Sequence, residues 1–176
     1  VDFSTHLNQN GISTVRFDQP CSGNSEGDYL NSSFNDWVAT TTYLAQQYAE
    51  QGYQVALMGQ SMGASTSVVA SADPSLQGKI AALLLWVPDP KSAIKVERQK
   101  IYEEAGQLYQ GKFWTEARQS NFYGCLEKFT NPIHLVYGEE DRYIPLEVRQ
   151  ELMQKVQAKQ GEIMLLRGED HSPWSF

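Results

Sequence analysis

Apolar side chains occur along this chain in two patterns that predict different elements. Short runs of apolar and β-branched residues predict buried strands. The run at 80–87 (IAALLLWV) is apolar at every position, which is typical of a strand in the middle of a parallel sheet that is covered on both faces. The predicted strands are Ile12–Asp18, Tyr53–Met58, Ile80–Val87, Pro132–Tyr137 and Glu162–Leu166.

Between these runs, apolar residues recur at spacings of three and four, which is the helical period. The segment Phe34–Tyr48 carries such a stripe. Ser32 and Ser33 precede it as candidate N-caps, and Gly52 follows it as a C-terminal glycine. Strands that alternate with helices predict an α/β fold, a mainly parallel sheet flanked by helices. The other helices are predicted at Ser61–Ala72 and around Val148, Leu152 and Val156.

Residues 89–131 interrupt this alternation with a polar, aromatic-rich stretch that predicts helices. We interpret the stretch as a short helical cap, inserted between two strands of one sheet within a single domain that spans residues 1–176. Two roles for its aromatic side chains stay open, because they either line an apolar acyl pocket or seat the cap on the sheet. These side chains are Tyr109, Phe113, Trp114 and Phe122.

Composition narrows the classes of function. A net charge of −7 argues against nucleic acid and anionic lipid as partners, because both require a basic face. The longest apolar run, Ile80–Val87, is too short to span a bilayer. No secretory signal is visible, and Cys21 and Cys125 lack metal-type spacing, so a cytoplasmic, reduced protein is expected. Neither a metal-ligand cluster nor a phosphate-binding glycine loop is present, so no metal or cofactor is expected.

The strongest chemical signal is the motif GQSMG at Gly59–Gly63. It follows a predicted strand and opens a predicted helix, which is the context of a nucleophile elbow. In such an elbow the turn presents the hydroxyl of Ser61, and we expect flanking side chains to clash, which explains the two glycines. The backbone N–H of Met62 would donate to an oxyanion. A plain glycine-rich turn is the alternative.

A nucleophilic serine needs a base and an acid that orients the base. Asp141 comes just after the predicted strand PIHLVY, and so at the same sheet edge as Ser61. Glu140 is the rival acid. His171 follows the last predicted strand, in the order Ser, acid, His that this architecture uses.

The other histidines are less suited to the role of base. His134 lies inside a predicted strand, and His6 lies in a predicted helix at the surface. Asp170 is adjacent to His171 in sequence, so their side chains diverge. Asp170 is therefore expected to cap the loop.

These motifs resemble the α/β-hydrolase superfamily. The loop FDQPCSGNSEG at 17–27 is similar to the loop after the fourth strand of that fold, and GQSMG, GEEDRYIP and DHSPW are similar to its later motifs. The likeness is greatest to single-domain esterases of the cinnamoyl-ester and carboxylesterase type and to serine-aminopeptidase-like hydrolases. Cys21 replaces the usual first glycine of the loop, and its role as a second nucleophile is not expected.

The resemblance implies a serine hydrolase that cleaves small-to-medium acyl or aryl esters through an acyl-enzyme. Its substrate would be a small molecule. A thioesterase, amidase or peptidase with the same triad is an alternative, and so is a hydrolase-like binding protein of weak turnover.

The resemblance also implies that something is missing. In the family, the first oxyanion N–H comes from a His-Gly loop that precedes the point where this chain begins, and a closing helix follows the catalytic histidine. The family's third strand lies between those that match 12–18 and 53–58. We therefore expect a truncated hydrolase, or one that completes its sheet with a partner or a second copy, because an apolar edge is left.

Overall fold

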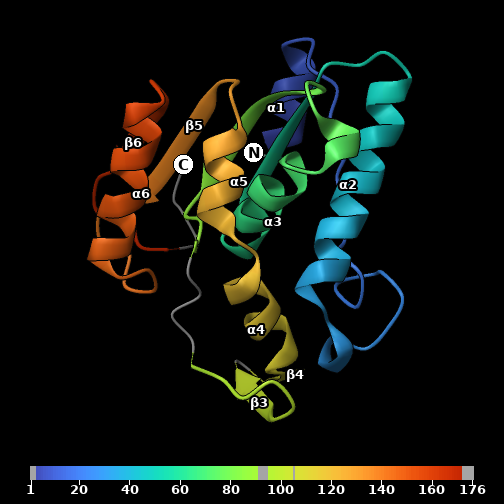
Figure 1. Cartoon of the computed structure of the whole chain (residues 1–176), viewed down its shortest axis with the longest axis vertical. Coiled ribbons are helices and arrows are strands. Elements are labelled where there is room, and N and C mark those ends of the chain that lie inside the picture. The colour runs from blue at the N-terminus through green and yellow to red at the C-terminus, as the bar shows by residue number, and fades with distance from the viewer. Residues whose placement is uncertain (1–2, 91–94, 105, 172–176) are drawn as a thin grey trace.

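The computed structural model describes residues 3–90, 95–104 and 106–171. Its centre is a sheet of four parallel strands in the order β1-β2-β5-β6 (Figure 1). Strand β2 is paired with β1 and with β5, so it lies inside the sheet, as its apolar sequence predicts. The predicted α/β fold with a parallel sheet is thus confirmed. The strands are β1 Val55–Gln60, β2 Ile80–Trp86, β5 Ile133–Gly138 and β6 Glu162–Leu166.

Most helices lie on one face of this sheet. Helix α3 packs on β1 and β2, α6 packs on β5 and β6, and α2 packs on α3. The predicted N-cap Ser33 accepts the N–H of Asp36 through its side chain, so α2 begins where the sequence indicates. The bounds are α1 Phe3–Gln9, α2 Phe34–Glu50, α3 Met62–Ser71 and α6 Leu146–Ala158, with 3₁₀ helices η1 Tyr29–Asn31 and η2 Pro74–Leu76.

The core lies between the sheet and these helices. Leu83, Leu85 and Leu135 point into it and are fully buried. Trp86 follows Leu85 and therefore points to the opposite face, where its ring contacts Phe3 of α1 with centroids 5.3 Å apart. This opposite face is less covered. Met58 and Met164, which share it, are 38% and 57% exposed.

The prediction of a strand at 12–18 is wrong. This segment runs without strand pairing, and its apolar side chains Ile12, Val15 and Phe17 are exposed. A β-branched composition makes a strand only where a neighbouring strand accepts its backbone hydrogen bonds. Within the described ranges no strand lies on the outer edge of β1, so β1 is an edge strand.

The segment between β2 and β5 (89–131), which we call the insert, differs from the helical prediction in its described residues. Its first described element is an antiparallel hairpin, in which Tyr102 and Tyr109 stack across the two strands. Two helices follow. Figure 1 places the hairpin and α4 together at one end of the molecule, whereas α5 lies beside α3. The elements are β3 Ile101–Glu104, β4 Gln107–Gln110, α4 Lys112–Gln119 and α5 Phe122–Lys128.

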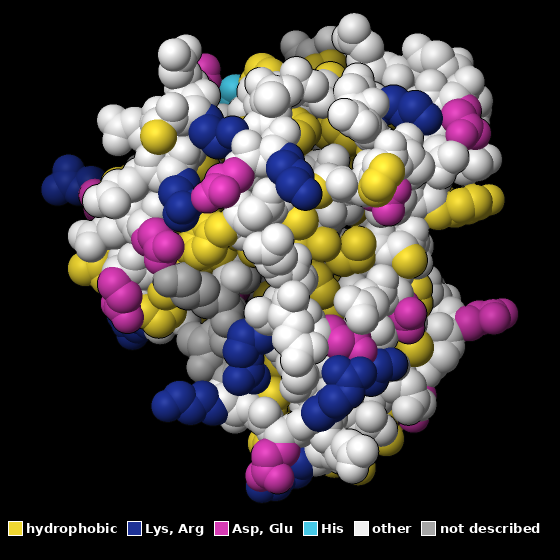
Figure 2. Space-filling model, in the orientation of Figure 1, with side chains coloured by type: hydrophobic (Ala, Val, Ile, Leu, Met, Phe, Trp, Pro, Cys, Tyr) yellow, Lys and Arg dark blue, Asp and Glu magenta, His cyan; other side chains and the backbone are white. Residues whose placement is uncertain are grey.

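None of the described helices is long and apolar enough to cross a membrane. On the face drawn in Figure 2, Lys and Arg side chains are interspersed with Asp and Glu side chains. Mixed charge of this kind leaves no continuous basic stripe on that face.

Candidate active site

Ser61 lies in a strained turn between β1 and α3. Its backbone has φ 52° and ψ −121°, a combination that non-glycine residues rarely adopt, and its N–H donates to the carbonyl of Trp86 at 2.8 Å. This bond ties the turn to the neighbouring strand. The strand–turn–helix context expected from the motif GQSMG is therefore present, and it places the Ser61 hydroxyl at the carboxyl edge of the sheet.

The two glycines of the motif differ in what they require. A Cβ built at Gly59 would lie 2.2 Å from the backbone carbon of Gly63 and 2.5 Å from the nitrogen of Ala64. The expected clash therefore holds at Gly59. A Cβ at Gly63 would meet nothing within 4 Å outside its own helix, so the expectation of a clash there is wrong. The turn needs one glycine for close approach, and that glycine is the one before the serine.

The imidazole of His171 lies between Ser61 and Asp141. Its Nε2 is 2.9 Å from the Ser61 Oγ, and its Nδ1 is 3.0 Å from the Asp141 Oδ2. The side chain of His171 is 13% exposed, and that of Asp141 is fully buried. An ionised carboxylate only accepts hydrogen bonds, so Nδ1 carries the proton and Nε2 is free to accept from the serine. The structure thus brings together the three residues that the sequence singles out.

Asp141 lies in the loop between β5 and α6 (139–145), which we call the acid loop. Its Oδ1 accepts the N–H groups of Tyr143 and Ile144, both at 2.9 Å. Burial raises the pKa of this carboxyl, but the hydrogen bonds from His171, Ile144 and Tyr143 and the charge of His171 outweigh burial and hold the pKa below its ordinary value. Asp141 is therefore ionised at neutral pH.

Backbone contacts join the acid loop to the loop of His171. The N–H of Glu139 donates to Leu166, and that of Glu140 donates to Glu169. A Cβ at Gly138 would lie 2.3 Å from the Glu169 carbonyl oxygen, so only glycine permits this approach. Asp141 and His171 therefore follow neighbouring strands, β5 and β6, whose ends are held in register.

The rival candidates lie elsewhere. Glu140 is exposed, although its backbone helps to join the two loops. His134 pairs with Glu162 on the sheet face at 2.9 Å, and His6 is exposed on α1. Asp170 accepts the N–H groups of Arg142 and of His171 itself, at 3.0 and 2.7 Å. It therefore caps the loop, as expected, and its bonds keep the acid loop and the histidine loop together.

The backbone N–H of Met62 lies directly beside Ser61, at the start of α3. Met62 is the first residue of α3, where N–H groups lack intrahelical partners. Within the described part of the chain, no acceptor engages this N–H. It is therefore available to a substrate oxygen beside Ser61.

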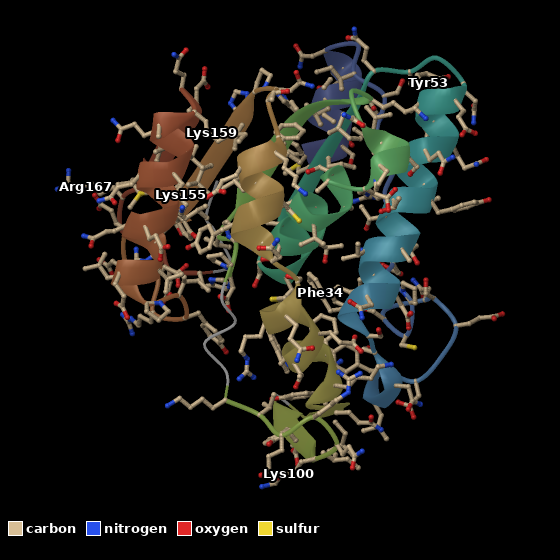
Figure 3. The ribbon with its side chains drawn as sticks, in the orientation of Figure 1. Phe34, Tyr53, Lys100, Lys155, Lys159 and Arg167 are labelled. Atoms are coloured by element: carbon tan, nitrogen blue, oxygen red, sulfur yellow. The ribbon has the colours of Figure 1, made fainter. Side chains whose placement is uncertain are left out.

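The four aromatic residues for which two roles stay open have packing contacts. Phe113 is 5% exposed and meets the rings of Phe34 and Trp37 from α2. Figure 3 shows Phe34 where α2 approaches α4. Phe122 belongs to α5 and is buried in the main core. These contacts favour the alternative that the aromatics seat the insert. Tyr109 and Trp114 extend the same cluster, with ring centroids 6.3 Å apart.

Two residues of the site escape sequence reasoning. The ring of Tyr143 stacks on the imidazole of His171, with centroids 5.1 Å apart and an interplanar angle of 29°. The guanidinium of Arg149, in α6, bonds to the backbone of the acid loop. Tyr143 could have been suspected because it is two residues from Asp141. Nothing in the sequence distinguishes Arg149 from an ordinary polar helix residue.

A comparison with models of protein families identifies the family of this chain. A family model described as serine aminopeptidase, S33, matches residues 1–110, which include Ser61 but neither Asp141 nor His171. The chain belongs to this family. It is therefore a hydrolase. A comparison with curated proteins finds no match for it.

Solved structures agree on the fold. Est1E from Butyrivibrio proteoclasticus with bound ferulic acid superposes with a TM-score of 0.83 at 20% identity, over 96% of this chain and 72% of that one. A monoacylglycerol lipase from Paleococcus ferrophilus gives 0.73 at 17% identity, over 96% and 78%. A putative hydrolase from Agrobacterium vitis S4 gives 0.76 at 16% identity, over 94% and 71%. Likeness at these identities shows the α/β-hydrolase fold alone.

Proposed function

We propose that this hydrolase is a serine esterase that uses Ser61, His171 and Asp141 as its catalytic triad. The observation that carries the proposal is the continuous hydrogen-bonded relay from Ser61 Oγ through the imidazole to the Asp141 carboxylate. A lone serine is a weak nucleophile, and this arrangement supplies the base and the orienting acid that activate it.

The reaction would proceed through an acyl-enzyme. Ser61 Oγ attacks the ester carbonyl carbon while its proton passes to His171 Nε2. The resulting oxyanion accepts the N–H of Met62. The carbon–oxygen bond to the alcohol then breaks, and His171 donates its proton to that alcohol. A water molecule repeats these steps and releases the acid, with its proton taken by His171 and returned to Ser61. Asp141 stabilises the imidazolium in both halves.

Carboxylic esters of small-to-medium acyl or aryl groups are the proposed substrates. Support comes from Est1E, whose structure contains ferulic acid, and from the monoacylglycerol lipase, since both share this fold. A peptidase is the second candidate, because the matched family is described as serine aminopeptidase. A thioester uses the same chemistry. We also propose a cytoplasmic setting, in which Cys21 and Cys125 remain free thiols, as they are in the structure.

Association with a second copy is proposed as well, with β1 as the contact. Its outer edge has no strand beside it among the described residues, and an unpaired edge is prone to pair with another chain. Solution mass by light scattering tests this point. A monomer at all concentrations would contradict it.

Turnover of p-nitrophenyl esters, acyl thioesters and aminoacyl amides by matched variants tests the proposal. Ser61→Ala and His171→Ala should lose several orders of magnitude of ester turnover, and Asp141→Asn somewhat less. Ser67→Ala and His134→Ala are the controls and should keep the ester turnover of the wild type. Ester turnover that survives Ser61→Ala would refute the mechanism.

A further inference from the structure

The guanidinium of Arg149 is a buried positive charge that contacts the loop carrying Asp141. Arg149 is only 7% exposed, and burying a charge is costly unless it is well bonded. Its position near the first turn of α6 adds to the cost, because the positive end of the helix dipole disfavours a cation there. Strong compensating contacts are therefore expected around the guanidinium.

Among the described residues, the hydrogen bonds of Arg149 go to backbone carbonyls at the end of β5 and in the acid loop that follows it. The Nε–H of Arg149 donates to the carbonyl of Ile144 at 3.1 Å. Its Nη1 donates to the carbonyls of Gly138 at 3.1 Å and Glu139 at 3.3 Å. Gly138 is the last residue of β5, Glu139 begins the loop, and Ile144 lies near its other end. A guanidinium is a rigid planar fork, so these bonds fix the two ends of the loop relative to each other.

Asp141 lies between the two ends that Arg149 joins. Ile144 is bonded twice, because its carbonyl accepts from Arg149 and its N–H donates to Asp141 Oδ1 at 2.9 Å. The other carboxylate oxygen faces His171 Nδ1. A continuous chain of hydrogen bonds therefore runs from the guanidinium through the loop to the imidazole.

We propose that Arg149 is a positioning residue that holds the Asp141 carboxylate in place for His171. The inference rests on the proposed esterase function. Arg149 acts through the loop, since its hydrogen bonds end on backbone carbonyls and reach neither Ser61 nor His171. When the fork is lost, the loop relaxes and the carboxylate moves. A misplacement of about 1 Å typically costs on the order of 10²-fold in rate. The loss should appear in kcat and leave KM unchanged, because no substrate contact is removed.

Two variants of Arg149 separate the effect of its bridging hydrogen bonds from the effect of its positive charge. Arg149→Met keeps an unbranched side chain and removes every donor. Arg149→Lys keeps the positive charge but cannot bridge carbonyls at both ends of the loop. Arg167→Met is the matched control, because Arg167 follows β6 in the loop that leads to His171 and its side chain points away from the body of the protein (Figure 3).

Three measurements are made on each variant. Ester turnover gives kcat and KM, and thermal unfolding by circular dichroism shows that the variant is folded. The downfield proton resonance of His171 Nδ1–H reports its hydrogen bond to Asp141 and requires no substrate. Because this resonance is independent of turnover, it tests Arg149 even if the wild type proves to cleave no ester, an outcome that would overturn the proposed function instead.

The expected result is that both Arg149 variants fold, lose about 10–10²-fold in kcat at unchanged KM, and shift or lose the His171 resonance. Arg167→Met should match the wild type in all three measurements. A folded Arg149→Met with wild-type kcat and resonance would overturn the proposal. If only Arg149→Lys folds, its kcat and resonance decide in the same way. If neither variant folds, Arg149 serves the fold as a whole, and the positioning role is rejected.

Discussion

The glycine before the nucleophilic serine should tolerate no side chain, whereas the glycine after Met62 should tolerate one. In Gly59→Ala the added Cβ would be 2.2 Å from the Gly63 carbon, more than 1 Å closer than ordinary van der Waals contact. The neighbours are backbone atoms at the start of α3, so the elbow itself must shift. Overpacking of this kind costs about 1–3 kcal/mol of stability, and a shift of about 1 Å at Ser61 costs on the order of 10²-fold in turnover.

Gly63→Ala should have the opposite effect on stability. A Cβ there meets nothing within 4 Å outside the helix, and alanine is favoured over glycine inside a helix by about 0.5–1 kcal/mol. Urea denaturation of both variants measures the two free energies of unfolding, and ester turnover measures the displacement of Ser61. A Gly59→Ala protein as stable and active as the wild type would refute this account of the elbow. So would a Gly63→Ala protein that unfolds.

Two further predictions concern buried carboxylates. Because the folded-state pKa of Asp141 is lowered, its ionised form stabilises the protein above the unfolded value near 3.8, and this stabilisation is lost as pH falls through the folded pKa. Wild type should therefore unfold at a higher urea concentration than Asp141→Asn at neutral pH, and this difference in urea concentration should shrink below about pH 4. A difference that grows at low pH would contradict the lowered pKa of Asp141. Glu116 in α4 is buried and accepts hydrogen bonds from the Oγ of Ser33, the N-cap of α2, at 2.8 Å and from Arg98 Nη2 at 3.0 Å. Glu116→Gln should cost about 1–3 kcal/mol in urea denaturation, against about 0–1 for the exposed Glu127→Gln, and equal costs would show that Glu116 does not fasten the insert.

The strands of the sheet were predictable because their partners are supplied by the chain itself. The four confirmed strands begin and end within two residues of their predicted bounds, and continuous apolar runs identify them. The segment 12–18 has the same composition but no strand to pair with among the described residues. The composition of a segment shows that it could form a strand. Whether it does depends on a neighbouring strand, which the sequence of the segment itself does not reveal.

The hairpin β3–β4 was missed for a different reason. Its strands, IYEE and QLYQ, are short and polar, and they pair only with each other. They therefore lack the apolar periodicity that a sheet face imposes. The turn includes Gly106 at φ 80°, and this glycine is the one local signal that favoured a hairpin over a helix.

Within the site, the residues that sequence reasoning found are those that follow a strand. Ser61, Asp141 and His171 come just beyond β1, β5 and β6, so topology alone brings them to one edge. Arg149 was missed because its partners are backbone carbonyls, and backbone carbonyls leave no trace in residue types. The clash expected at Gly63 was wrong because the motif does not show which of the two glycines has its Cβ position against the backbone of the turn.

Labelling with a fluorophosphonate probe tests the central claim most directly, because the probe reacts with an activated serine and ignores an idle one. The protein is treated with the probe, digested, and the modified peptide is identified by mass spectrometry in wild type, Ser61→Ala and His171→Ala. We predict a single label on Ser61, absent from Ser61→Ala and formed far more slowly in His171→Ala. A folded wild-type protein that takes no label at Ser61, or that is labelled equally fast without His171, would contradict the account.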